Sequence, residues 1–230
     1  MKIRYLILLC VLIVSPMAAQ PRMVTNRNLQ LPRIAKAKPR NIVFILTDDH
    51  RYDAMGFLKS QAFIETPNLD AMAGNGVYLK NAFVTTALCS PSRASILTGM
   101  YAHQHRVVDN NNPVPNDLVF VSQYLQRAGY ETAMIGKWHL GGPEAAPEAR
   151  GFQFNLGGDH RGQPPSYFSP YGLPRLPDGP RGEYLTDREG EEAARFIREH
   201  RDRPFFLNYW AHAVHTPIQA KPDYVAATEK

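Results

Sequence analysis

The segment around Cys89 combines a potential nucleophile with a potential anion-binding side chain. Cys89 is followed by Ser-Pro-Ser-Arg, and proline, here Pro91, is favoured in the first turn of a helix. We therefore expect a helix over 91–98 that ends at Gly99, with Cys89 at its N-terminus. Free backbone N–H groups and the helix dipole favour negative charge there, and Arg93, one turn further on, can face the same anion. The pattern predicts a cysteine with a lowered pKa beside an anion-binding site.

Two other interpretations of this segment stay open when only its own residues are considered. A thiol phosphatase also places an arginine after a nucleophilic cysteine, but with more than the three intervening residues found here. A small cysteine buried before a helix is a frequent structural arrangement that needs no chemistry. Cys89 therefore requires partners elsewhere in the chain before a reaction can be assigned to it.

Polar residues that could take part in chemistry directly follow three apolar runs. These are Asp48 and Asp49 after 41–47, Lys137 and His139 after 130–135, and His215 after 205–210. Ligands of parallel α/β sheets bind beyond the carboxyl ends of the strands. If the three runs are neighbouring parallel strands, the three sets of polar residues converge on one edge of the sheet.

Strands that alternate with helices predict an α/β fold, with a mostly parallel sheet sandwiched by helices. We expect strands at 41–47, 77–84, 130–135 and 205–210, and helices at 66–73, 91–98, 117–128 and 186–200. The first run is continuously apolar, which is typical of a strand buried on both faces. Residues 140–182 are rich in proline and glycine and predict a long loop region.

The motif Cys-x-Pro-Ser-Arg at 89–93, followed by Leu-Thr-Gly, resembles the signature of the formylglycine-dependent sulfatases. These arylsulfatase-like enzymes belong to the alkaline-phosphatase-like superfamily, and the resemblance runs from Asn41 to the C-terminal end. It implies sulfate ester hydrolysis after a maturation enzyme has converted Cys89 to Cα-formylglycine. One hydroxyl of the hydrated aldehyde would attack sulfur, and the second would allow sulfate to be eliminated. The chain would then be the N-terminal catalytic part of such a fold, with the C-terminal part missing.

The resemblance implies that Asp48, Asp49 and the converted Cys89 bind Ca²⁺. Adjacent carboxylates repel each other unless a cation lies between them, and calcium prefers oxygen ligands. Taken alone, an Asp-Asp pair is more often a turn or a helix cap. Family members supply two further metal ligands and a lysine after the His-x-Pro block, and we find no substitute for them here. We therefore expect an incomplete calcium site and no activity from the 230 residues alone.

Arg93, Lys137, His139 and His215 are the remaining catalytic residues of the predicted sulfatase site. Arg93 faces the anion, and the resemblance implies that Lys137 binds sulfate and the modified residue. His139 would take the diol proton during sulfate elimination, and His215 would bind sulfate and help to protonate the leaving alcohol. Outside this context, a loop lysine and histidine need no catalytic role. His212 lies off the motif and fits a structural or supporting role.

The loop region carries aromatic and basic side chains that suit a sulfated sugar through stacking and charge pairing. They are Tyr167, Phe168, Tyr171, Arg161, Arg175 and Arg181. Ordinary loop packing accounts for the same composition equally well. The first hypothesis is hydrolysis of a sulfated polysaccharide or glycosaminoglycan. The alternatives are a phosphatase or phosphodiesterase of the same superfamily, and a decayed, non-catalytic sulfatase that binds sulfated glycans.

Three segments are expected along the chain. Residues 1–20 have the basic start, short apolar run and small-residue end of a signal peptide, with an uncleaved anchor as the alternative. Residues 21–40 predict a basic flexible linker, and 41–230 predict the truncated sulfatase catalytic domain. We expect an exported protein, periplasmic or extracellular, without stable insertion in a membrane.

The charges and cysteines of the chain exclude two further classes of protein. Residues 1–40 hold eight basic and no acidic residues, whereas 41–230 hold 18 basic and 21 acidic residues. The net positive charge therefore belongs to the leader and linker, and it gives no argument for binding nucleic acid. Once a signal peptide containing Cys10 is removed, Cys89 is the one cysteine left, so we expect no disulfide framework.

Overall fold

The computed structural model describes residues 36 and 38–228, so the predicted signal peptide and most of the predicted linker lie outside the described residues. The strands are β1 (Ile42–Leu46), β2 (Glu131–Gly136), β3 (Phe154–Leu156) and β4 (Phe205–Trp210). The α-helices are α1 (Pro67–Asn75), α2 (Cys89–Thr98), α3 (Ala102–His105), α4 (Val121–Arg127), α5 (Leu185–His200) and α6 (Pro222–Thr228). Three short 3-10 helices are η2 (Gly56–Leu58), η3 (Pro143–Ala145) and η4 (Pro147–Arg150).

The four strands form one parallel sheet in the order β1-β4-β2-β3. The register pairs Leu46 of β1 and Gly136 of β2 with Trp210 of β4, so these three strands end at the same level. The backbone N–H of Lys137 continues the ladder by donating to Trp210 O at 2.7 Å. This confirms that the polar residues after the three strands emerge along one edge of the sheet.

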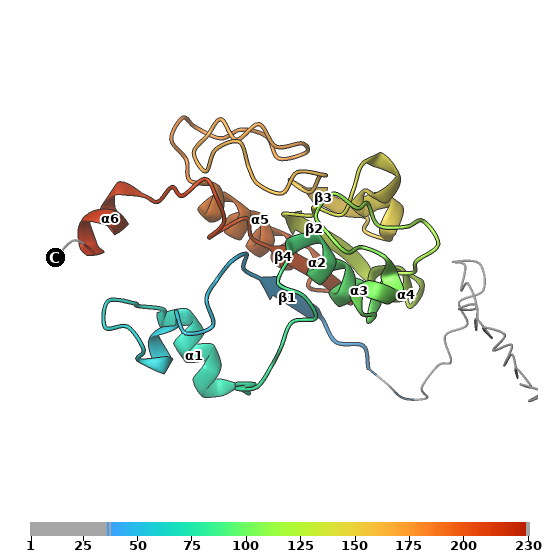
Figure 1. Ribbon diagram of the computed structural model, residues 1–230, viewed down its shortest axis with the longest axis horizontal. Helices are drawn as coiled ribbons and strands as arrows, with labels where there is room; N and C mark the ends of the chain where they lie inside the picture. Colours follow the sequence, from blue (N-terminus) through green and yellow to red (C-terminus); the bar gives the residue numbers. More distant parts are fainter. Residues whose placement is uncertain (1–35, 37, 229–230) are drawn as a thin grey trace, which may run out of the picture.

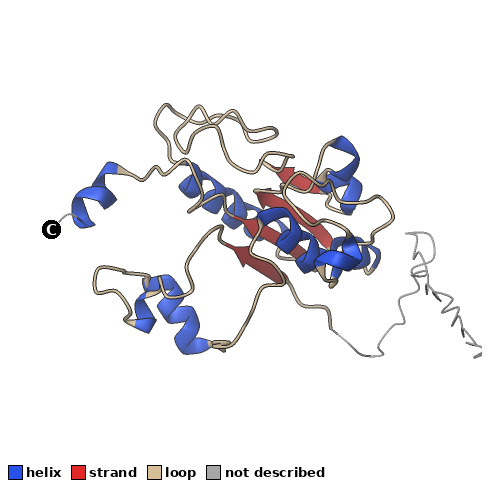
Figure 2. Cartoon of the chain, in the orientation of Figure 1, coloured by secondary structure: helices blue, strands red, loops and turns tan. Residues whose placement is uncertain are grey.

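Helices cover both faces of the sheet, as Figures 1 and 2 show. The alternation of side chains along β4 explains this arrangement, because successive residues of a strand point to opposite faces. Phe206 and Trp210 belong to the buried cluster that contains Ala94 and Leu97 of α2. On the other face, Phe205, Leu207 and their neighbours pack against Ala193 and Phe196 of α5. The expected α/β fold with a helix-covered parallel sheet is therefore confirmed.

The expectation that the first strand is buried on both faces is wrong. Phe44 and Leu46 pack against the cluster beneath α2, but Val43 and Ile45 on the opposite face are 44% and 49% exposed. The reason is the position of β1 at the edge of the sheet, where α5 lies against β2 and β4 instead (Figure 1). A continuous apolar sequence was therefore not sufficient to identify a covered strand.

The strand expected at 77–84 is also absent from the structure. This segment is irregular, and Val77, Leu79, Phe83 and Val84 are between 69% and 90% exposed. A strand needs a neighbour to satisfy its backbone hydrogen bonds, and no described strand pairs with this segment. High β propensity alone did not produce a strand here because propensity acts mainly through packing.

The remaining elements differ from expectation mainly at their ends. The helix expected at 117–128 begins only at Val121, where Gln123 Oε1 accepts the Phe120 N–H at 2.8 Å and completes the first turn. The helix predicted at 186–200 and the strand at 205–210 are confirmed as α5 and β4. The loop region at 140–182 also contains β3, η3 and η4, which are too short to give a periodic sequence signal.

Gly136 is the point at which β2 turns into the loop that carries Lys137. Its φ is +95°, and a Cβ there would lie 2.1 Å from Trp210 O. We expect Gly136→Ala to lower the free energy of unfolding by about 3 kcal/mol or more, because both strain and overlap oppose it. Gly74→Ala is the matched control in α1, where a Cβ meets nothing within 4 Å, and should raise stability by up to about 1 kcal/mol. Equal effects of the two substitutions in denaturant titrations would contradict this account.

Candidate active site

The N-terminus of α2 positions Cys89 at the carboxyl edge of the sheet. The helix begins at Cys89 itself rather than at Pro91, after Leu88 in an extended conformation. One backbone N–H of this helix end is not free for an anion, because the Ser90 N–H donates to Asn110 Oδ1 at 3.0 Å. The Ser90 hydroxyl donates to His139 O at 2.5 Å and so ties this end of α2 to the loop after β2.

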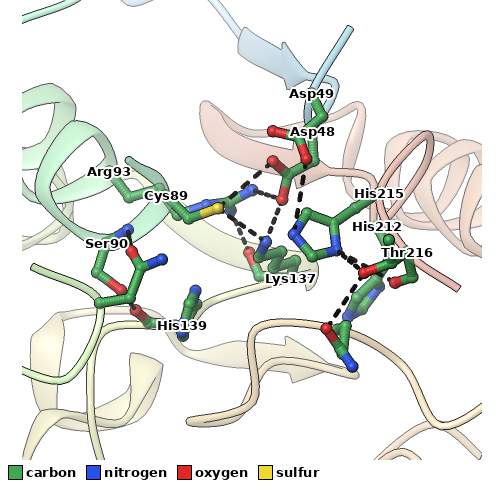
Figure 3. Close-up of polar contacts among 12 residues, drawn as sticks. Asp48, Asp49, Cys89, Ser90, Arg93, Lys137, His139, His212, His215 and Thr216 are labelled. Carbon is green, nitrogen blue, oxygen red and sulfur yellow. Dashed lines mark hydrogen bonds and ion pairs between the residues drawn. The ribbon is translucent and has the colours of Figure 1, made fainter. Parts of the chain in front are cut away.

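Three charged side chains from different elements meet beside Cys89 (Figure 3). Lys137 is completely buried, forms an ion pair with Asp48 and donates from Nζ to Cys89 Sγ at 3.3 Å. Arg93 is 2% exposed and donates from Nη2 to Asp48 Oδ2 at 3.1 Å and from Nη1 to Lys137 O at 2.6 Å. Its guanidinium lies over the ring of Trp210, 5.0 Å from the centroid. The residues predicted to surround the cysteine are therefore brought together.

The charges of this cluster keep Asp48 ionised. Burial raises the pKa of the Asp48 carboxyl, but the nearby charges of Arg93 and Lys137 outweigh burial and bring its pKa below the ordinary value. Burial lowers the pKa of Arg93, while Asp48 opposes that change. Two cations against one carboxylate leave a positive surplus next to Cys89, which favours an anionic group at this position.

His139 lies directly beyond this cluster, in a backbone conformation with φ +59°. Its N–H donates to Asp159 O at 2.9 Å, and Gly162 lies against its ring. Nδ1 is buried and has no hydrogen-bond partner among the described residues. Burial, followed by the charges of Lys137 and Arg93, lowers the pKa of His139 to about 4. The ring is therefore neutral at neutral pH and has a lone pair that can accept a proton, while the two nearby cations keep it a weak base.

His215 completes the group around Cys89, and Asp49 lies beside His215, as Figure 3 shows. One ligand atom each from Asp48, Cys89 and His215 lie within 4.8 Å of one another. Asp49 is not part of that group: its side chain is 62% exposed, and its Oδ2 lies 3.7 Å from His215 Nε2. The two adjacent aspartates therefore play different structural roles, with Asp48 inside the cluster and Asp49 at its rim.

His212 supports the loop that carries His215. It is 2% exposed, and its Nδ1 lies 2.5 Å from Oε1 of the fully buried Glu189 on α5. Its carbonyl accepts the His215 N–H at 3.2 Å and the Tyr167 hydroxyl at 2.6 Å. This buried pair agrees with the supporting role expected for His212, whereas the sequence contained no signal for Glu189 as its partner.

The described residues at this edge of the sheet supply some, but not all, of the oxygen ligands that a hard cation such as calcium needs. Asp48 Oδ2 accepts both the arginine and the lysine, but Oδ1 faces the Cys89 side chain, 3.8 Å from Sγ. The exposed carboxylate of Asp49 adds a second oxygen donor nearby. Calcium takes about six to eight oxygen ligands, so water and further groups would have to complete the shell. Asp48 and Asp49 could therefore hold the predicted ion together with an oxygen at residue 89.

The structure also corrects the interpretation of the loop region. Tyr167 and Tyr171, considered above for stacking on a sugar, are 1% and 0% exposed and pack in a third buried cluster with Leu185. Arg175 pairs with Glu148 at 2.8 Å. These tyrosines therefore serve packing, because their rings lie beneath the loop surface instead of on it.

Residues that sequence reasoning missed hold the site together through loop contacts. The Asn110 side chain accepts the Ser90 N–H in the first turn of α2, and the Asp159 carbonyl accepts the His139 N–H. Neither contact follows a regular spacing, so no periodic signal could have indicated it. Within the described residues, no helix is both long and apolar enough to cross a membrane.

Solved structures show the same arrangement of sheet and helices. A structure described as a complex with its substrate D-glucosamine-2-N,6-O-disulfate gives a TM-score of 0.68 at 34% identity, over 81% of this chain and 37% of that chain. The phosphonate monoester hydrolase of Agrobacterium radiobacter gives a TM-score of 0.59 at 20% identity, over 83% of this chain and 44% of that chain, and shows similarity of fold alone. The protein has the alkaline-phosphatase-like α/β fold predicted above.

The family within this fold class follows from sequence comparison. The sulfatase family model matches residues 40–230, and the chain belongs to the sulfatase family. The N-acetylglucosamine-6-O-sulfatase of Bacteroides thetaiotaomicron is 36% identical over 202 residues, covering 84% of this chain and 34% of that relative. Human N-acetylgalactosamine-6-sulfatase is 31% identical over 230 residues, covering 84% of this chain and 43% of that relative. The chain thus spans less than half the length of these curated relatives.

The low pKa of His139 gives a prediction for stability against pH. Unfolded His139 binds a proton below about pH 6.5, whereas folded His139 binds it only below about pH 4, so the folded state loses stability as pH falls through this window. We expect His139→Gln to remove about 2–3 kcal/mol of that loss, seen as a smaller difference in unfolding free energy between pH 7 and pH 4. His103→Gln, at an exposed ring, is the control and should leave the loss unchanged. Identical pH profiles for the parent and His139→Gln would show that the ring is not desolvated.

Proposed function

We propose that the protein hydrolyses sulfate esters of carbohydrates with residue 89 as the nucleophile. The observation that carries this proposal is the meeting of Asp48, Arg93 and Lys137 around Cys89, at the edge where three parallel strands end. Membership of the sulfatase family supports the reaction class. The names of the relatives, which refer to sulfated amino sugars, support a carbohydrate substrate.

Residue 89 acts after conversion of Cys89 to formylglycine by a maturation enzyme. The thiol Sγ marks the position that the formylglycine oxygens would take, and the hydrated aldehyde supplies the nucleophilic hydroxyl. Lys137 Nζ, 3.3 Å from Sγ, donates a hydrogen bond to that oxygen and orients it toward sulfur. The Arg93 guanidinium is buried and held by Asp48. It therefore keeps the Asp48 carboxylate in position and contributes positive electrostatic potential at the sulfate.

The two histidines divide the proton transfers between them. His139, neutral at neutral pH, accepts the proton that residue 89 loses when sulfate is released. His215 approaches the cluster from the β4 side and donates a proton to the leaving alcohol. The surroundings of the two rings differ, because His139 faces the two cations and His215 faces Asp49.

Calcium is the metal that the carboxylates favour. Asp48 and Asp49 would hold it, and the bound ion would polarise the sulfate group and stabilise negative charge in the transition state. The lowered pKa of Asp48 keeps its carboxylate ionised and available as a ligand. We propose in addition that the protein is exported and acts on sulfated polysaccharide or glycosaminoglycan, in agreement with the leader composition.

The nucleophile is tested with the protein expressed from its complete open reading frame in a host that makes formylglycine. We expect the peptide containing residue 89 to show the mass of an aldehyde in place of the thiol. Cys89→Ala should lower kcat for N-acetylglucosamine-6-sulfate by at least about 10⁴-fold, since the covalent step is lost. His103→Ala, at an exposed position, is the control. Full turnover by Cys89→Ala would instead favour a water-based mechanism or another nucleophile.

The metal site is tested by thermal unfolding after chelation. Calcium added at about 100 times its Kd should raise the Tm by roughly 5–10 °C, because it binds only the folded state. Asp49→Asn should abolish most of this rise, since it removes a charged ligand. Asp53→Asn removes a nearby carboxylate that pairs with Arg51 and should keep the full rise. A calcium effect that survives Asp49→Asn unchanged would place the ion elsewhere.

A further inference from the structure

A short loop at 159–163 lies between the two candidate catalytic histidines. At one end, the Asp159 carbonyl accepts the His139 N–H at 2.9 Å, and a Cβ on Gly162 would lie 2.6 Å from His139 Cε1. At the other end, Gln163 Oε1 accepts the Thr216 hydroxyl at 3.3 Å, next to His215 in the chain. The loop is thereby fixed against the site at both ends.

This loop forms one wall of an open hollow of about 600 Å³. Its lining consists of Arg161, Gly162, Gln163, Pro164 and Pro165 from the loop, with Thr216 and Pro217 from the segment after β4. The volume lies within the range of about 300–1,000 Å³ that is typical of small-molecule sites. The three prolines restrict the backbone on both sides, so the hollow is largely preformed. The hollow adjoins both histidines, because Gly162 lies against the His139 ring and Thr216 follows His215 in the chain.

Arg161 is the only charged side chain among the described residues that line this hollow. Its Nε donates to Asp159 Oδ2 at 2.5 Å, and its backbone N–H donates to Asp159 Oδ1 at 2.8 Å. Nη1 and Nη2 have no protein partner in the part of the chain that the structure describes, and the side chain is 33% exposed. A guanidinium that is oriented at Nε and free at both Nη atoms can bind a planar pair of oxygens, as in carboxylate or sulfate.

We propose that Arg161 binds a second anionic group of the substrate, so that the preferred substrate is a sulfated sugar that carries another sulfate or a carboxylate. This inference rests on the proposed function and adds the substrate class to it. The lining of the hollow brings Arg161 together with Thr216, the residue that follows His215 in the chain. The structural relative that was solved with a glucosamine disulfate binds a sugar with two such groups.

The experiment measures binding, so that it does not depend on turnover. The full-length Cys89→Ala protein is titrated by calorimetry with N-acetylglucosamine-6-sulfate and with glucosamine-2-N,6-O-disulfate. We expect the disulfate to bind more tightly, and we expect Arg161→Ala to reduce the ratio of the two affinities about tenfold. A 6-sulfated amino sugar linked to a uronate, titrated in parallel, shows whether the second group is a sulfate or a carboxylate.

Arg203→Ala is the matched control, because Arg203 also pairs with a carboxylate, Glu131 at 2.7 Å, but precedes β4 at the opposite end of the sheet. It should leave the affinity ratio unchanged. An unchanged ratio in Arg161→Ala, or an equal fall in Arg203→Ala, would overturn the assignment of the second anion site. The proposed hydrolysis can fail separately. If the unsubstituted protein hydrolyses neither sugar but the affinity ratio still depends on Arg161, the second anion site is upheld and the hydrolysis is rejected.

Discussion

The buried carboxylate of Asp48 is the constraint around which the site is organised. It follows β1, and its two cationic partners come from the start of α2 and from the end of β2. A charge removed from water costs several kcal/mol unless it is paired and hydrogen-bonded, so Lys137 and Arg93 must both be in place when the sheet and α2 pack together. Their pairing with Oδ2 leaves Oδ1 directed at residue 89. The ion pairs that compensate the buried charge of Asp48 thus also orient its carboxylate toward residue 89.

Sharp turns at the strand ends allow neighbouring residues to serve different purposes. Asp49 and His139 both adopt left-handed backbone conformations, with φ values of +54° and +59°. This region is uncommon for residues other than glycine and costs about 1–2 kcal/mol per residue. Backbone hydrogen bonds hold these turns in place, from Asp48 to Ala213 and from His139 to Asp159. The turns let Asp48 point inward while Asp49 stays at the rim.

The sequence was sufficient to predict the parallel sheet and the convergence of its polar strand ends. This worked because β2 and β4 are buried on both faces and pass directly into polar residues, so each strand appears as a continuous apolar run with a clear end. Apolar composition could not show which side of β1 is covered, nor that 77–84 has no strand partner, since both depend on distant packing. The contacts of Asn110 with the start of α2 and of the Asp159 carbonyl with His139 were equally hidden, because hydrogen bonds made by irregular loops follow no sequence period.

The position of β1 in the sheet has a consequence for how the chain is made. Its partner β4 lies about 160 residues later, with Ile42 opposite Phe206. At synthesis rates of about 5–20 residues per second, β1 waits roughly 8 to 30 s for its partner strand β4. During that interval an apolar strand with an open edge can pair with other chains. We expect the nascent protein to depend on chaperones that shield this strand until β4 has been synthesised.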